Sequence, residues 1–258
     1  MKEMMYKVAD LVRAVSGKAP CRFTSAIIVA AGNSTRMGGG ISKQMTMLEG
    51  MPVVARTLRA YQQSPEIGEI IVVAREDEMA RYEEFKEKYQ LTKLAHIVRG
   101  GNDRQESVMN GLKKVREDAG FVAIADAARC LITPAMVGRV CRNAYLYGSA
   151  TAACRVVDTV KTANADGFID DTIDREKVWL AQTPQVFSLK IYRAAAYSAL
   201  EKNFKATDDN SLVERIHRRI KLVDCGQENI KITTREDLVR AKLILQARRE
   251  IAERGDEQ

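Results

Sequence analysis

Apolar and polar residues alternate along this chain in two periods. Short continuous apolar runs predict buried strands over residues 26–30, 67–74, 96–98, 121–125 and 150–157. Segments with apolar residues three or four positions apart predict helices from Pro52 to about Ser64 and over residues 77–89, 105–116, 134–147 and 236–253. This alternation predicts the α/β class, with a Rossmann-like, mostly parallel sheet and helices on both of its faces.

Residues 156–187 break this rhythm. Asp166-Gly167 lies between two extended runs, which is a typical hairpin signal. We therefore predict a β-arm at about residues 156–178 that projects from the sheet. Because a two-stranded arm is only marginally stable alone, we expect it to pack on a second subunit.

The remaining segments complete the predicted domain organisation. Residues 1–22 form an N-terminal extension whose apolar residues have near-helical spacing, so the extension is expected to be helical. Residues 23–253 then form a single domain that includes the arm. Residues 254–258 are a polar tail.

Composition narrows the classes of function. The 258 residues carry 41 Lys+Arg against 34 Asp+Glu, a net charge of +7 that suits anionic ligands. No long basic run is present and aromatic residues make up only 6%, which argues against a nucleic-acid binder. Five widely spaced cysteines without a C-x-x-C motif indicate a reduced, cytoplasmic protein. No apolar run approaches the roughly 20 residues of a membrane span.

A glycine-rich loop follows the first predicted strand. It reads Ala-Ala-Gly-Asn-Ser-Thr-Arg-Met-Gly-Gly-Gly over residues 30–40, and Lys43 comes soon after. Gly32 permits a tight turn whose N–H groups can surround an anion, and Arg36 and Lys43 add positive charge. Neither common phosphate-loop pattern is matched, and an ordinary surface loop can have the same composition.

Two further loops follow predicted strands, at Gly100 and at Asp126. In a parallel sheet, ligands bind outside the carboxyl ends of the strands. We therefore expect these two loops and the glycine-rich loop to converge on one edge of the sheet.

Seven separated blocks occur in an order that resembles the 2-C-methyl-D-erythritol 4-phosphate cytidylyltransferase family. They are residues 30–44, Gly100-Gly101 with Arg104 and Ser107, residues 126–129, 157–161 and 181–187, residues 207–209 with Ser211 and Glu214, and residues 229–234. The resemblance spans roughly residues 25–247. It implies a nucleotidyltransferase domain that transfers a cytidylyl group from CTP to 2-C-methyl-D-erythritol 4-phosphate, with release of pyrophosphate.

The resemblance also implies roles for single residues. Arg36, Lys43 and Lys231 would be catalytic, by gripping the triphosphate and approaching the α-phosphate. Five residues would bind the nucleotide: Ala30, Ala31, Gly32, Gly101 and Ser107. Six would bind the substrate: Asp126, Arg129, Thr159, Arg175, Thr183 and Thr207, of which Thr159 and Arg175 would come from the neighbouring subunit of a homodimer. Mg²⁺ would be held mainly by the CTP phosphates, with no protein metal site.

The chain departs from the family pattern at four positions. Ala125 and Cys130 flank the Asp126 block, Ser42 stands in place of proline, and Asn102 stands where an acidic residue is common. Two other functions therefore stay open at this point. One is a cytidylyltransferase for another polyol phosphate, such as ribitol 5-phosphate, and the other is a catalytically silent nucleotide-binding protein.

Overall fold

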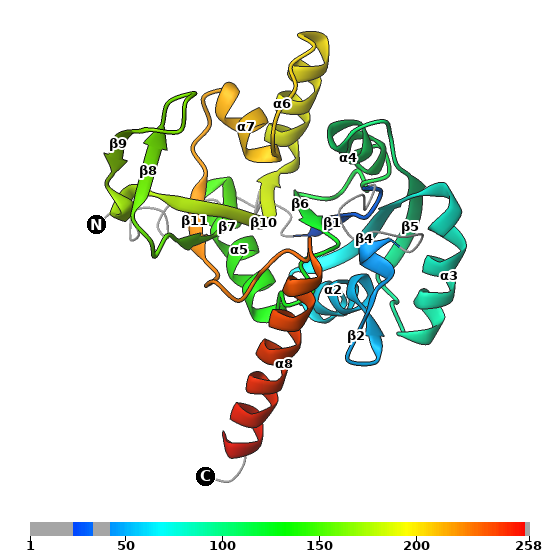
Figure 1. The fold of residues 1–258 in the computed structure, drawn as a ribbon. Coiled ribbons are helices and arrows are strands. Elements are labelled where there is room, and N and C mark those ends of the chain that lie inside the picture. The colour runs from blue at the N-terminus through cyan, green and yellow to red at the C-terminus, as the bar shows by residue number, and fades with distance from the viewer. Residues whose placement is uncertain (1–22, 33–41, 256–258) are drawn as a thin grey trace.

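A seven-stranded sheet forms the centre of the protein (Figure 1). The structure is a computed structural model, and it describes residues 23–32 and 42–255. The strand order is β11-β7-β10-β6-β1-β4-β5, and only β10 runs antiparallel to its neighbours. The bounds are β1 Thr24–Val29, β4 Ile67–Ala74, β5 Leu94–Arg99, β6 Phe121–Asp126, β7 Ser149–Arg155, β10 Trp179–Ser188 and β11 Lys221–Asp224. The predicted mostly parallel α/β fold is confirmed.

Helices cover both faces of this sheet, as Figure 1 shows. On one face pack α2 (Val53–Gln63), α3 (Met79–Lys88) and α5 (Pro134–Tyr147), whose buried residues include Leu58, Tyr82 and Val140. On the other face pack α4 (Arg104–Leu112), α6 (Leu189–Glu201) and α7 (Asp209–Arg215). Burial on both faces explains the continuous apolar runs at residues 26–29 of β1 and 70–74 of β4.

The last helix, α8 (Arg235–Gly255), packs in a smaller cluster. Its residue Ala241 is buried with Leu48 and Val53, beside the short hairpin of β2 (Met47–Leu48) and β3 (Met51–Pro52). The C-terminal half of α8 extends away from the sheet (Figure 1). None of the described helices is long and apolar enough to cross a bilayer.

The predicted arm is a hairpin of β8 (Val160–Ala163) and β9 (Ile169–Ile173), which stands away from the main sheet (Figure 1). Gly167 has a φ of +86° in the turn, a conformation that glycine adopts without strain. A 3₁₀ turn, η4 (Arg175–Lys177), follows β9. The predicted single domain stays a prediction, and residues 1–22 and 256–258 lie outside the described part of the chain.

Several sequence expectations were wrong in detail. The helix predicted over residues 105–116 ends at Leu112. After it, the N–H groups of Lys114 and Val115 bond to carbonyls three residues back, which forms a turn in place of α-helix. Strand β10 was missed, since its middle contains Gln182, Thr183 and Gln185, which look like loop residues but are buried. Around Lys231 the side chains alternate, because Ile230 and Ile232 pack in the core whereas Lys231 lines the cavity described below.

Candidate active site

A cavity of about 340 Å³ lies at the carboxyl ends of β1, β5 and β6. The loop after β1 contributes Ala30, Ala31 and Gly32 to its wall. The loop after β5 contributes Gly101, and the loop after β6 contributes Ala127 and Ala128 among others. The three strand-end loops thus converge on one edge of the sheet, as the alternating pattern predicts.

Asp126, the last residue of β6, lies among three cations in this cavity. Its carboxylate is 2.9 Å from Lys231 Nζ, 3.7 Å from Arg129 Nε and 3.9 Å from Arg104 Nε. Burial by itself raises the pKa of Asp126, but the charges of these neighbours, Lys231 foremost, outweigh it and hold the pKa below its usual value. Asp126 is therefore ionised at neutral pH, and the group of four carries a net positive charge.

Lys231 reaches this group from the loop before α8. The N–H of Ile232 donates to the carbonyl of Ala128 over 2.9 Å, and the Ile232 side chain is fully buried. On the other side, the Asp237 carboxylate accepts from the backbone N–H groups of Thr233 and Thr234, which fixes the first turn of α8. Lys231 is thus held between a strand end and a helix start.

Lys43 also lines the cavity, at the start of the 3₁₀ turn η2 (Lys43–Met45). The next residue, Gln44, is buried and donates from its side chain to the carbonyl of Ala30 and to Glu78. This bond ties the exit of β1 to the segment that carries Lys43. Arg36, the other predicted cation of the glycine-rich loop, lies outside the described residues and stays a prediction.

Ser107 and Gly101 are joined directly. The Gly101 N–H donates to Ser107 Oγ over 3.0 Å, and Ser107 Oγ donates to the carbonyl of Asp103 over 2.8 Å. Asp103 caps α4 by accepting from the Glu106 N–H. Ser107 therefore has a structural role in this loop as well as a place in the cavity wall.

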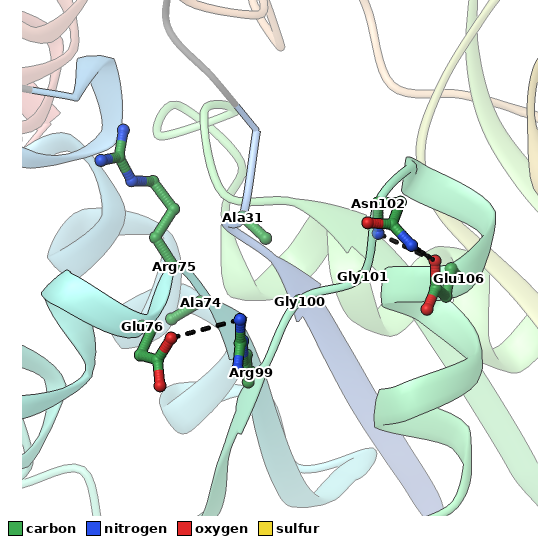
Figure 2. Close-up of a pocket in the computed structure, with 9 residues that line it drawn as sticks. All are labelled: Ala31, Ala74, Arg75, Glu76, Arg99, Gly100, Gly101, Asn102 and Glu106. Carbon is green, nitrogen blue, oxygen red and sulfur yellow. Dashed lines mark hydrogen bonds and ion pairs between the residues drawn. The ribbon is translucent and has the colours of Figure 1, made fainter.

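A second cavity of about 440 Å³ adjoins the first, and Figure 2 shows it. Both cavities are lined by Ala31, Gly101 and Asn102. The Asn102 side-chain amide donates to Glu106, and the backbone N–H of Asn102 donates to the same carboxylate oxygen. A carboxylate thus lies beside Asn102 even though the family's acidic residue is absent from that position.

The predicted substrate-binding residues fall into three places. Arg129 and Thr183 lie beside Asp126, because Arg129 pairs with its carboxylate and Thr183 Oγ accepts from its N–H over 3.0 Å. Thr207 lines a separate cavity of about 700 Å³, between β10, α7 and β11. Thr159 and Arg175 are exposed on the arm, where Arg175 donates to the carbonyl of Val157. Within one chain, the described residues therefore do not bring Thr207, Thr159 or Arg175 to the Asp126 cavity.

Sequence reasoning gave no role to Arg104, which lines the same cavity. Its guanidinium also lies 2.7 Å from Asp209, which is buried. Both residues belong to blocks that carried the family resemblance, and that membership was the one available signal.

The comparisons with known proteins agree with this geometry. The family model described as 2-C-methyl-D-erythritol 4-phosphate cytidylyltransferase matches residues 24–247. A protein of that name from Caldanaerobacter subterraneus subsp. tengcongensis is 45% identical over 222 residues, which cover 86% of this chain and 98% of the relative. The chain belongs to this family. The cytidylyltransferase from Pelotomaculum thermopropionicum is 42% identical over 233 residues, 90% of this chain and 98% of the relative.

Solved structures lead to the same family. The 4-diphosphocytidyl-2C-methyl-D-erythritol synthase from Anaerococcus prevotii matches with a TM-score of 0.77 and 32% identity, over 88% of this chain and 97% of that one. The cytidylyltransferase from Thermus thermophilus matches with a TM-score of 0.70 and 27% identity, over 85% and 97% of the two chains. The predicted family, its fold and its class, nucleotidyltransferase, are confirmed.

Proposed function

We propose that this cytidylyltransferase moves the cytidylyl group of CTP onto 2-C-methyl-D-erythritol 4-phosphate, with release of pyrophosphate. One observation carries the proposal: Lys231 and Lys43 face one cavity from distant parts of the chain, and Asp126, Arg104 and Arg129 line or adjoin it. Family membership supports this acceptor over ribitol 5-phosphate and over a silent nucleotide binder.

The reaction requires no nucleophile from the protein. A phosphate oxygen of the acceptor, already anionic at neutral pH, attacks the α-phosphorus of CTP. A new phosphorus–oxygen bond forms, the bond from the α-phosphorus to the bridging oxygen breaks, and that electron pair leaves with pyrophosphate. No proton must move, so catalysis consists of aligning two polyanions and stabilising the charge that builds on the α-phosphate. Lys231, Lys43 and Arg36 are the cations that we assign to this task.

The nucleotide is assigned to the border of the two adjoining cavities. Ala31 and Gly101 line both of them, and small residues there let a flat base approach the main chain. Ala30, Gly32 and the Ser107 hydroxyl complete this nucleotide-binding set. The Gly101 N–H already donates to Ser107 Oγ, so a bound base would either take the place of one partner in this hydrogen bond or add a further hydrogen bond to it.

The acceptor is assigned to Asp126, Arg129 and Thr183 of one subunit, with Thr159 and Arg175 of a second. Thr207 lines a separate cavity, so its predicted contact with the acceptor has no support from the geometry of one subunit. A homodimer through the arm is supported by large apolar side chains that the arm leaves exposed, among them Phe168 (70% exposed) and Ile169 (66% exposed). An arginine fork suits a phosphate, which fits Arg175 to the acceptor phosphate.

The residues present fit a Mg²⁺ ion that arrives with its nucleotide. No cluster of three metal-binding side chains occurs among residues 23–32 and 42–255, and Asp126 is the carboxylate next to Lys231. Triphosphate oxygens and waters would complete the coordination, and the bound ion would neutralise charge on the leaving pyrophosphate.

A cytoplasmic location is supported by the free, buried state of Cys130, Cys141, Cys154 and Cys225.

Turnover of defined acceptors tests this function. The purified protein is incubated with CTP, Mg²⁺ and either 2-C-methyl-D-erythritol 4-phosphate or ribitol 5-phosphate, while pyrophosphate release is followed and the product mass is determined. We expect release with the methylerythritol phosphate and a product of the mass of 4-diphosphocytidyl-2-C-methyl-D-erythritol. Faster turnover with ribitol 5-phosphate would show that this compound is the acceptor instead. CTP binding without turnover of either compound would contradict the proposal that the protein is an active cytidylyltransferase.

A further inference from the structure

Arg104 bridges two carboxylates that come from different parts of the fold. Its Nη2 lies 2.7 Å from Asp209 Oδ2, at the start of α7, and its Nε lies 3.9 Å from Asp126 Oδ1, at the end of β6. Arg104 is the first residue of α4, and its side chain is 32% exposed where it faces the cavity. It therefore connects the helix that carries Ser107 with the element that follows Thr207.

The Asp209 carboxylate, the one outside the cavity, is fixed by several contacts. Asp209 is 2% exposed and accepts a hydrogen bond of 2.5 Å from the Tyr192 hydroxyl. Its backbone N–H donates to the side chain of Gln185, which in turn donates to Asp208 over 2.8 Å. Burial and the Asp209 carboxylate both raise the pKa of Tyr192 well above its usual value, so the phenol remains a donor.

A buried ion pair of this kind is a poor source of stability, because desolvation offsets most of the attraction. The ion pair does fix the orientation of the side chains, because a planar guanidinium can pair with two carboxylates at once. Burial lowers the pKa of Arg104, but Asp209 and Asp126 outweigh that effect and raise the pKa, so the side chain is always charged. Asp209 and Tyr192 do not line the Asp126 cavity, whereas Arg104 lines it and contacts both Asp209 and Asp126.

We propose that Arg104 is a positioning residue: Tyr192 and Asp209 anchor its guanidinium, and the guanidinium orients the Asp126 carboxylate for the acceptor. This inference rests on the proposed function for its kinetic readout. It assigns a role to the chain Tyr192–Asp209–Arg104–Asp126 beyond the cations that stabilise the transferred phosphate.

Kinetics on Arg104→Lys and Tyr192→Phe test the inference. Arg116→Lys is the matched control, because Arg116 also pairs with an aspartate, Asp118, but neither residue lines the cavity. A lysine cannot reach both carboxylates, so we expect kcat with the methylerythritol phosphate to fall about 10²-fold, by analogy with loss of one preorganised donor. The KM for CTP should change less than about threefold. Tyr192→Phe removes one hydroxyl and should lower kcat about threefold to tenfold, and the control should match the wild type.

A second measurement separates this inference from the proposed function. The pKa of the Asp126 carboxyl is followed by NMR in the wild type and in Arg104→Lys, which needs no turnover. We expect the pKa to rise in the variant, because the guanidinium no longer favours the ionised form. An unchanged Asp126 pKa, or unchanged kcat in an active enzyme, would overturn the positioning role. Absence of turnover in the wild type would overturn the proposed function only.

Discussion

The Lys231 ammonium lies 2.9 Å from the Asp126 carboxylate, although the two residues are far apart in the sequence. The first comes from the loop before α8 and the second from the end of β6. An anionic substrate that enters this cavity meets a lysine whose position is already fixed by a partner. Such preorganisation is what electrostatic stabilisation of a transition state requires.

Replacing Lys231 by methionine tests its role directly. We expect kcat to fall about 10²- to 10³-fold, as it does when one preorganised donor is removed from a transition-state site. Lys86→Met is the control, because Lys86 is exposed on α3 and does not line the cavity. Steady-state pyrophosphate release measures both. An equal, small effect in the two variants would show that Lys231 is an ordinary surface cation.

The ionisation of Asp126 makes stability depend on pH in a defined direction. Because the folded-state pKa is lowered, ionised Asp126 contributes to the free energy of unfolding above the unfolded pKa of about 3.9. That contribution is lost as the pH falls through the lower, folded pKa. Urea unfolding of the wild type and Asp126→Asn at several pH values measures it. We expect the wild type to be more stable by about 3 kcal/mol at pH 7 and the difference to shrink at pH 3.

Gly100 approaches Ala31 so closely that an added Cβ would overlap the Ala31 side chain. Gly100→Ala should therefore push apart the ends of β5 and β1, cost about 1–3 kcal/mol in stability and weaken CTP binding. Calorimetry gives both quantities. The double variant Ala31→Gly/Gly100→Ala removes the overlapping methyl and should recover most of the loss. Failure of this rescue would assign the effect to the Gly100 backbone instead.

The exposed apolar residues of the arm predict a subunit interface. Phe168→Glu should convert a dimer to a monomer, as measured by light scattering, because burying the new charge is costly. If Thr159 and Arg175 serve the neighbouring subunit, the same variant should raise the KM for the acceptor. Met47→Glu is the control, since Met47 is also exposed (58%) but lies on β2. A wild type that is monomeric at assay concentration would remove the basis for sharing these residues.

The sequence predicted those parts of the fold whose pattern is local. Residues 70–74 of β4 form a continuous apolar run because both faces of the strand are covered. Asp166-Gly167 marks the turn of the β8–β9 hairpin, where Gly167 has a positive φ. Strand β10 could not be predicted in this way, because its polar residues are satisfied by distant partners. Gln182, for example, accepts from Asn229, and Gln185 donates to Asp208.

The same distinction between local pattern and distant contact applies to the residues of the site. Lys43, Asp126 and Lys231 were identified from motifs and do line one cavity. The bridge from Arg104 to Asp209 was not identified, because nothing in the spacing of two separate blocks says that their charges meet. The proposed contribution of Thr159 and Arg175 would come from a second subunit, so it stays a prediction.

The anchoring of Lys231 between Ala128 and the first turn of α8 also bears on synthesis. The glycine-rich loop leaves the ribosome before this lysine and the helix that secures it, because about 190 residues separate them. A growing or prematurely terminated polypeptide could therefore collapse around its first strands and still lack the ammonium group opposite Asp126. Only a polypeptide that already includes α8 has both Asp126 and its lysine partner in place, so shorter copies would lack the charge arrangement of the site.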